Sequence, residues 1–185
     1  MVKRDFIRNI IIALIVIVIA ILLRIFVFST IEINKDSANS YLKAGDLVTI
    51  KRNIKPQYKD FVVYEVDDKE FVSRVIATGG QSATYMDDIF YLNNGIEDQN
   101  YIEKLKNDYL STSPMGSLFT EDFNISTISK GNNTVIPEGK FLLLNDNRQN
   151  QADSREFGLI DRKQIKGVVT FRVLPLDDFG FIEVE

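Results

Sequence analysis

The two residue types that supply many side-chain catalysts are missing from this chain of 185 residues, which has no cysteine and no histidine. Thiol nucleophiles, disulfides and metal sites built on cysteine or histidine are therefore excluded, and so is a Ser-His-Asp triad. Any catalysis must use a hydroxyl, a carboxylate or an amine. We expect neither a cofactor nor a metal.

A stretch rich in polar and charged residues covers residues 145–160, between the apolar run 141–144 and the apolar residues 157–160 at its end. Within residues 146–155 it carries four charges of balanced sign, Asp146, Arg148, Asp153 and Arg155. Such a set can be a solvated loop, or a hydrogen-bonded scaffold that holds neighbouring catalytic groups in place. Composition alone favours the solvated loop.

Two serines are candidates for a catalytic nucleophile or for its partner. Ser37 lies in a polar stretch that is followed by Gly45 and Asp46, and Ser73 lies in the apolar stretch 71–76. Taken alone, a serine such as Ser37 is more typical of a turn or a cap. As a nucleophile it needs a base, and lysine is a base only where burial depresses its pKa. The neighbour of Ser73 is Arg74, which cannot release a proton at neutral pH.

The first element ahead of these residues is an apolar stretch over residues 10–28. Its length corresponds to roughly 28 Å of helix, close to the hydrocarbon thickness of a bilayer. We predict an uncleaved transmembrane anchor, because no small-x-small cleavage site follows it. Lys3, Arg4 and Arg8 precede it, so residues 1–9 are expected in the cytoplasm and residues 29–185 outside the cell membrane.

The remainder of the chain is rich in short β patterns separated by turn residues. We predict strands near residues 46–51, 60–64, 70–76, 89–92, 140–144, 168–173 and 179–184, with a hairpin turn at Asn94-Gly95. This spacing favours a mainly β fold, a partly open barrel or a sandwich. Residues 98–133 are polar with weak periodicity, and we interpret them as an inserted lobe. The net charge of -4 argues against nucleic acid as a partner.

The order of these motifs resembles the type I signal peptidase family, of the Gram-positive type. The similarity consists of the N-terminal anchor, a serine followed by L-x-x-G-D, the strand S-R-V-I, the hairpin Y-L-N-N-G, and then V-I-P-E-G-K-F-L-L-L-N-D-N-R. It is strongest where D-N-R and D-S-R-E-F-G match a box of that family. This resemblance extends over nearly the whole chain.

The resemblance implies a membrane-bound Ser/Lys endopeptidase that removes signal peptides from exported preproteins. It places Ser37 at the nucleophile position, although the methionine, proline and threonine of the family's serine box are not kept. The family's general-base lysine lies on a strand written K-R-V-I, and here Ser73 stands at that position. The resemblance implies a structural role for Asp153, in a salt bridge with Arg155.

A serine hydroxyl cannot replace a neutral lysine amine as a base near pH 7. We therefore expect a catalytically impaired or inactive homologue, which binds signal peptides of preproteins or an active paralogue. Lys69 lies roughly 13 Å from Ser73 along an extended strand, and Lys35 is two residues before Ser37. If either replaces the base, the chain is an active signal peptidase with an altered dyad. A further alternative is a bitopic surface binding protein of unrelated function.

Other departures from the family pattern agree with loss of activity. The family's glycine before D-N-R is Asn145, the serine of its next box is Gln151, and its P-G-D after the lysine strand is Gly-Gly-Gln at residues 79–81. The scaffold residues Asp153 and Arg155 are kept, whereas the general-base lysine is not. The sequence thus predicts a preserved fold around an altered centre.

Overall fold

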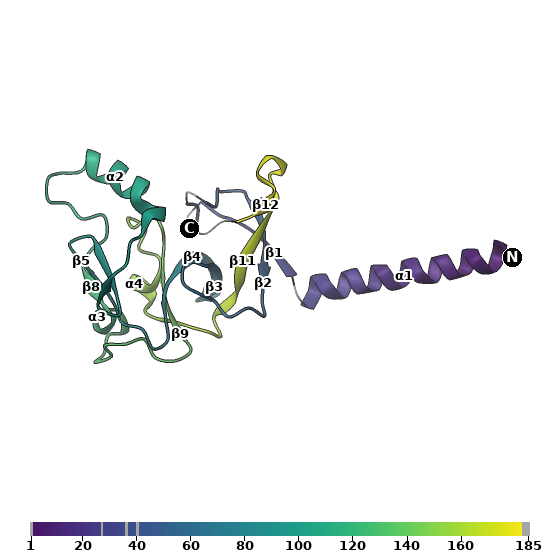
Figure 1. Ribbon diagram of the computed structural model, residues 1–185, viewed down its shortest axis with the longest axis horizontal. Helices are drawn as coiled ribbons and strands as arrows, with labels where there is room; N and C mark the ends of the chain where they lie inside the picture. Colours follow the sequence, from purple (N-terminus) through teal and green to yellow (C-terminus); the bar gives the residue numbers. More distant parts are fainter. Residues whose placement is uncertain (1, 27, 36, 40, 183–185) are drawn as a thin grey trace.

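The computed structural model describes residues 2–26, 28–35, 37–39 and 41–182. A long helix, α1 (Val2–Phe26), extends away from a domain made mainly of β-strands (Figure 1). The predicted strand at residues 179–184 is represented by β12 (Gly180–Phe181), and residues 183–184 lie outside the described residues. The mainly β fold expected from the sequence is confirmed.

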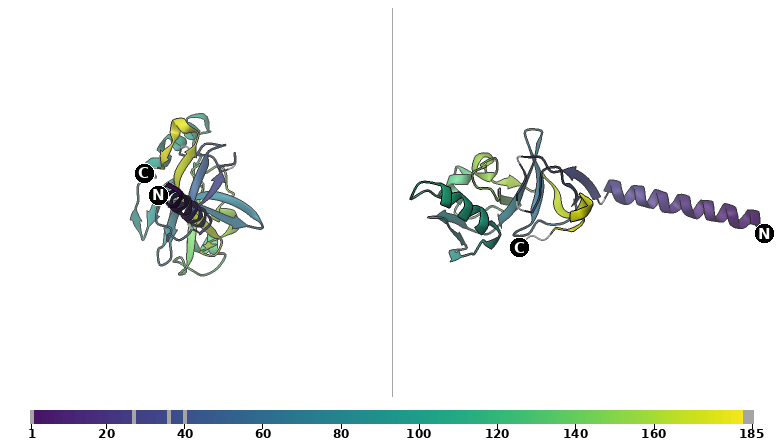
Figure 2. Two further views of the ribbon diagram at one scale, coloured as in Figure 1. Left: turned by 90° about the vertical axis from the view of Figure 1, so that its right-hand side faces the viewer. Right: turned by 90° about the horizontal axis from the view of Figure 1, so that it is seen from above.

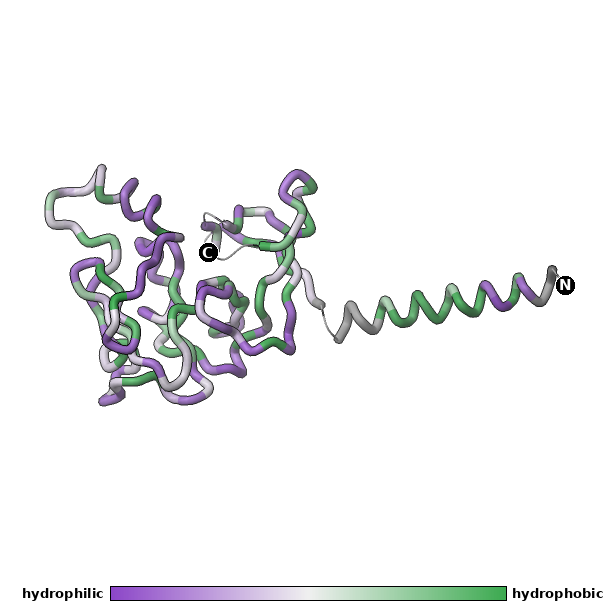
Figure 3. Tube along the Cα trace, viewed as in Figure 1, coloured by the Kyte–Doolittle hydropathy of each residue, from purple (hydrophilic) through white to green (hydrophobic). Residues whose placement is uncertain are grey.

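Helix α1 carries exposed apolar side chains on all sides between Ile10 and Ile21, the green part of the helix in Figure 3. Within the part of the chain that the structure describes, no helix is both long enough and apolar enough to count as a membrane span. The anchor predicted over residues 10–28, which includes undescribed residue 27, therefore stays a prediction.

The domain contains two antiparallel sheets (Figure 2). The larger sheet has the strand order β1-β2-β11-β3-β4-β9-β10, with β12 paired to β11. Its strands are β1 (Phe28–Glu32), β2 (Leu47–Lys51), β3 (Phe61–Val66), β4 (Lys69–Thr78), β9 (Lys140–Leu144), β10 (Ile160–Asp161), β11 (Ile165–Leu174) and β12. Strand β4 lies between β3 and β9, so both edges of its backbone are paired.

The smaller sheet has the order β7-β6-β5-β8. It consists of β5 (Ala83–Met86), β6 (Ile89–Leu92), β7 (Gly95–Ile96) and β8 (Phe123–Asn124). Residues 98–133, interpreted from the sequence as an inserted lobe, add β8 to this sheet and also form three helices. These are η1 (Asn100–Ile102), α2 (Glu103–Thr112) and α3 (Ile125–Ser129). The remaining short helices are α4 (Ser154–Phe157) and η2 (Leu176–Asp178).

Three hairpins turn through two residues that both have positive φ angles. The strand registers place these turns directly between paired strand ends. Asparagine and aspartate tolerate this left-handed conformation better than other side-chain-bearing residues, and it suits the twist of a two-residue hairpin. The turn residues are Asp67-Asp68, Asp87-Asp88 and Asn93-Asn94. The third hairpin was expected from the sequence, but its turn lies one residue earlier than the predicted Asn94-Gly95.

An apolar cluster joins the two sheets. It contains Tyr85 and Phe90 of the smaller sheet and Ile76 and Leu144 of the larger one, all buried. Because these side chains pack from both sheets, the ends of β4 and β9 are held in a fixed position relative to β5. Residues that follow β9 therefore start from a rigid point.

Gly167 is expected to be the least replaceable glycine of the larger sheet. A Cβ atom at this position would lie 2.7 Å from the carbonyl oxygen of Lys51 on the neighbouring strand β2, and backbone atoms cannot move away cheaply. We predict that Gly167→Ala lowers the free energy of unfolding by about 1–3 kcal/mol, measured by urea denaturation. Gly95→Ala is the matched control, since its nearest atom would be 3.6 Å away. Equal losses in both variants would contradict this prediction.

Candidate active site

Ser37 lies on a loop that closes between β1 and β2. The loop ends meet through two backbone hydrogen bonds between Ile33 and the pair Gly45 and Asp46, the amide of Ile33 donating to the Asp46 carbonyl at 2.8 Å. Ile33 and Leu42 are fully buried in the same apolar cluster as Val72 of β4. These two anchors hold the loop against β4.

The Ser37 side chain is buried and touches the backbone of β4. The amide of Val72 donates a hydrogen bond to Ser37 Oγ at 3.3 Å, and the amide of Ser37 donates to Asn34 Oδ1 at 2.8 Å. Among the described residues, none accepts the proton of the Ser37 hydroxyl. This proton is therefore available to water or to a ligand in the adjoining cavity.

Ser73 is also buried, with 1% of its surface exposed, and its hydroxyl is fully engaged. It donates to Asn145 Oδ1 at 2.8 Å and lies 3.0 Å from the hydroxyl of Tyr64. A serine hydroxyl has one proton, so the Tyr64 hydroxyl must be the donor in the second bond. Burial raises the pKa of Tyr64, which keeps it a neutral donor.

Strand register explains why these three residues meet. Arg74 is paired with Leu144, so the residue after β9, Asn145, comes beside Ser73. Ser73 is paired with Val62 on β3, and Tyr64 is two residues further along the same face. Asn145 is fixed in turn, because its Nδ2 donates to two carbonyl oxygens, those of Asn150 and Ala152, both at 3.2 Å.

The two serines line the same cavity, which has a volume of about 290 Å³. Ser37, Ser73 and Asn145 all line it. The rest of the lining is mainly polar. It consists of three further asparagines (Asn39, Asn147 and Asn150), Lys35, Asp146 and the apolar residues Ala38, Phe61 and Val72. The arrangement offers hydrogen-bonding groups to a ligand beside Ser37, but no buried amine among the described residues.

The two lysines considered as replacement bases have different positions. Lys69 is exposed and lines a separate cavity with Glu65, Asp68 and Glu70, so it is not brought to Ser37. Lys35 is exposed as well, but it lines the cavity that contains Ser37.

Next to Ser73, Arg74 forms a fully buried ion pair with Asp146. Its Nε and Nη2 donate to the two carboxylate oxygens at 2.7 Å each, and both side chains have 0% exposure. The guanidinium lies over the rings of Phe61 and Tyr101, with 4.1 Å from Cζ to each ring centroid. This bidentate geometry locks the start of the 145–160 segment to β4.

A second buried ion pair closes the other end of that segment. Asp153 is the N-cap of α4, and its carboxylate accepts from Nε and Nη2 of Arg155 at 2.9 and 2.7 Å. The same carboxylate accepts the amide of Asn145 at 2.9 Å. Arg155 also donates to the carbonyl oxygens of Arg148 and Asn150, both at 2.7 Å. Asp153 therefore fixes the backbone of Asn145, whose side chain holds Ser73.

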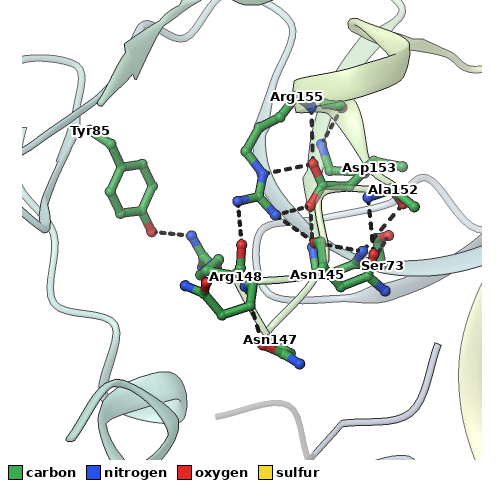
Figure 4. A network of polar contacts seen from close by, with 12 residues as sticks. Ser73, Tyr85, Asn145, Asn147, Arg148, Ala152, Asp153 and Arg155 are labelled. Atoms are coloured by element: carbon green, nitrogen blue, oxygen red, sulfur yellow. Dashed lines mark hydrogen bonds and ion pairs between the residues drawn. The ribbon is translucent and has the colours of Figure 1, made fainter. Parts of the chain in front are cut away.

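Arg148 points the other way, toward the smaller sheet (Figure 4). Its guanidinium is buried and donates to the Tyr85 hydroxyl at 2.6 Å and to Gln99 Oε1 at 3.0 Å. The Tyr85 hydroxyl donates to Gln99 as well. Arg148 thus ties the segment to the smaller sheet.

The solvated-loop interpretation of residues 145–160, which composition alone favoured, is wrong. Asp146, Arg148 and Asp153 are each at most 2% exposed, because each one has partners that local sequence does not reveal. Sequence reasoning also missed Arg74 and Tyr64 as members of the site. An arginine inside an apolar strand was a usable signal, since a buried guanidinium requires acceptors.

Three tyrosines next to the site predict a loss of stability in alkali. Burial raises the pKa of Tyr85 to about 12 and that of Tyr101 well above its usual value, as it does for Tyr64. The stability gained by keeping them neutral is complete below the unfolded pKa of about 10 and is lost as the pH rises through the folded values. Urea denaturation at increasing pH should show this loss together with tyrosinate absorbance.

The matched control is Tyr101→Phe, because the hydroxyl of Tyr101 has no partner among the described residues and its removal costs little. This variant should lose less stability in alkali than the parent. An identical pH profile would contradict the assignment.

Among the described residues, no group of three or more acidic side chains is placed to hold a metal ion. The residues described above make up the site: Ser37, Ser73, Asn145, Tyr64 and the buried ion pairs Arg74–Asp146 and Asp153–Arg155.

Comparisons with known proteins give a consistent result. The family model described as "Signal peptidase, peptidase S26" matches residues 5–174. Signal peptidase IB of Staphylococcus aureus strain MRSA252 is 30% identical over 186 residues, which cover 97% of this chain and 95% of that protein. Signal peptidase I of Bacillus caldolyticus is 34% identical over 164 residues, 86% of each chain. The crystal structure of a signal peptidase I from Enterococcus faecalis V583 superposes with a TM-score of 0.57 at 28% identity, covering 63% of this chain and 98% of that one.

Proposed function

This chain belongs to the signal peptidase family, peptidase S26, and from that premise we propose that it is a catalytically impaired or inactive member. In this proposal Ser37 occupies the nucleophile position and Ser73 the position of the missing general-base lysine. The protein binds the signal peptides of exported preproteins, or an active paralogue, and cleaves slowly or not at all.

The observation that carries the proposal is the engagement of the Ser73 hydroxyl. Its proton goes to Asn145 Oδ1 at 2.8 Å, and Tyr64 donates to its oxygen. A hydroxyl in this state does not accept the Ser37 proton, whereas a neutral amine would. Loss of a general base typically lowers the rate by about 10²- to 10⁴-fold. The position is therefore used for structure.

Binding is proposed because the rest of the site is built to hold a ligand. The Ser37 proton has no acceptor among the described residues, and the polar cavity beside it remains open. Asp146, Arg148, Asp153 and Arg155 support its walls through the buried contacts described above. A peptide carbonyl in the cavity would accept the Ser37 hydroxyl proton.

Location at the cell membrane is part of the same proposal. The exposed apolar side chains of α1 and the basic residues Lys3 and Arg8 before them support an anchor over residues 10–28, with the β domain on the outer side. The test is fractionation of cells, where the protein should stay with membranes after a high-salt wash. Release by salt alone would contradict the anchor.

Activity is tested by incubating the full-length protein, in a non-ionic detergent, with a peptide that carries a small-x-small cleavage site. An active family member serves as the positive control. We expect the parent to cleave at least about 10²-fold more slowly than the active member, Ser37→Ala not to cleave, and both to bind the peptide. Cleavage by the parent at the rate of the active member, lost in Ser37→Ala, would overturn the proposal.

That opposite outcome is the second candidate function, an active signal peptidase with an altered dyad. One observation favours it: Lys35 lines the cavity of Ser37. If the parent cleaves, Lys35→Gln should abolish the activity and Lys69→Gln should leave it unchanged, because Lys69 lines a different cavity.

A further inference from the structure

A second cavity, of about 290 Å³, lies in the smaller sheet among the β5–β6 hairpin, η1 and α2. It shares no lining residue with the Ser37 cavity. Its walls are partly apolar, with Ile89, Phe90, Ile96 and Ile102. Ile96 is 66% and Ile89 39% exposed, so apolar surface continues from the cavity to its mouth.

Carboxylates surround this apolar surface. Glu97, Asp98 and Glu103 line the cavity, and none of them forms an ion pair with any described residue. Asp88 differs, because its carboxylate already accepts the amides of Phe119 and Thr120 at 2.8 and 2.7 Å. Three carboxylates are therefore left without a cation.

Two cations nearby reduce but do not reverse this negative charge. Lys106 lines the cavity and donates to the carbonyl oxygen of Asp88 at 3.0 Å, and Arg148 lies behind Gln99 and Tyr85. Four carboxylates remain against these two cations. The carboxylates do not converge on one point, since the described residues include no acidic cluster suited to a metal ion. A suitable ligand must therefore be an organic cation with an apolar body.

We propose that this cavity binds a peptide segment that carries a lysine or arginine beside an aliphatic residue. The basic side chain lays its apolar stem along Ile89 and Ile96 and brings its charge to Glu97, Asp98 and Glu103. The aliphatic neighbour covers the exposed isoleucines. The volume lies at the lower limit of ligand pockets, roughly 300 Å³, which suits one or two side chains.

The binding energy expected from such a site is modest and depends on salt. Ion pairs at exposed positions are weak and are screened by added salt. Removing all three free carboxylates should therefore weaken binding about tenfold. Removing apolar contact with Ile96→Ser should weaken it by several-fold, without dependence on salt.

The test uses fluorescence anisotropy with full-length protein in a non-ionic detergent. The probe is a labelled peptide, Ser-Gly-Ile-Lys-Ile-Lys-Gly-Ser, and its counterpart has glutamate in place of lysine. The test variant combines Glu97→Gln, Asp98→Asn and Glu103→Gln. The control variant combines Asp67→Asn, Asp68→Asn and Glu70→Gln, which removes the same charge from exposed residues of the β3–β4 hairpin.

We expect the lysine peptide to bind the parent more tightly than the glutamate peptide. The test variant should weaken this binding about tenfold and the control variant less than about twofold. Ser37→Ala should bind as the parent does, which separates this site from the Ser37 cavity. Equal weakening by the control variant, equal binding of both peptides, or no binding of the lysine peptide would each overturn the proposal.

Discussion

Ser73→Lys combined with Asn145→Gly is expected to raise signal-peptide cleavage by about 10²- to 10⁴-fold over the parent, the range of a restored general base. Ser73→Lys alone should give little of this gain. The reason is Asn145 Oδ1, which lies 2.8 Å from the Ser73 hydroxyl, so that a longer side chain at position 73 is expected to meet it. Its Oδ1 would also accept a bond from a lysine ammonium and so stabilise the charged form.

The measurement is the rate of cleavage of a peptide with a small-x-small site by the parent, both single variants and the double variant. Ser37→Ala in the double variant should return the rate to that of the parent, because the regained base has no nucleophile to activate. Asn145→Gly alone controls for the loss of the asparagine bonds to Asn150 and Ala152. If Ser73→Lys alone is as active as the double variant, Asn145 does not block the site.

Asp146→Ala is expected to lower the free energy of unfolding by about 3–5 kcal/mol, enough to unfold a marginally stable domain. It removes the carboxylate that pairs with Arg74 through two bonds of 2.7 Å at zero exposure. The guanidinium, which is buried, would then lose its bidentate carboxylate partner. Urea denaturation measures the loss.

The matched control is Asp161→Ala, which breaks the exposed pair of Lys140 and Asp161. This loss should stay below about 1 kcal/mol, because water and salt already screen such pairs. A second variant, Arg74→Met with Asp146→Leu, removes both charges and should recover much of the stability, since no unpaired charge remains. Similar losses for Asp146→Ala and Asp161→Ala would contradict the role given to the buried pair.

The longer strands after residue 45 could be predicted from the sequence because their patterns are local. Residues 46–51, 60–64, 70–76, 89–92 and 140–144 read as strands, and β2, β3, β4, β6 and β9 lie there. Helix α2 was not predicted, because its apolar stripe is weak: none of residues 103–112 is fully buried, and Leu105 and Tyr109 pack only partly against the apolar cluster. The sequence also could not show that β8 completes the smaller sheet, since this pairing joins residues nearly forty positions apart.

The candidate site, too, could be predicted from the sequence only in part. The resemblance placed Ser37 and Ser73 near each other, and both line one cavity. The partners of Ser73 depend on strand register, which one sequence does not reveal, so Tyr64 was missed. The sequence marks Asn145 only as a departure from the family's glycine. Its role depends on the register of β4 and β9, which brings it to Ser73.

The mutual engagement of Ser73 and Asn145 also has a consequence for evolution. A lysine at position 73 meets the asparagine, and a glycine at position 145 leaves the Ser73 proton without its acceptor. Each single step toward a Ser/Lys enzyme thus disturbs the polar contacts of these two residues and brings little gain in rate by itself. A lineage that descends from this chain faces a two-step barrier, and selection for cleavage acts only weakly until both steps are present.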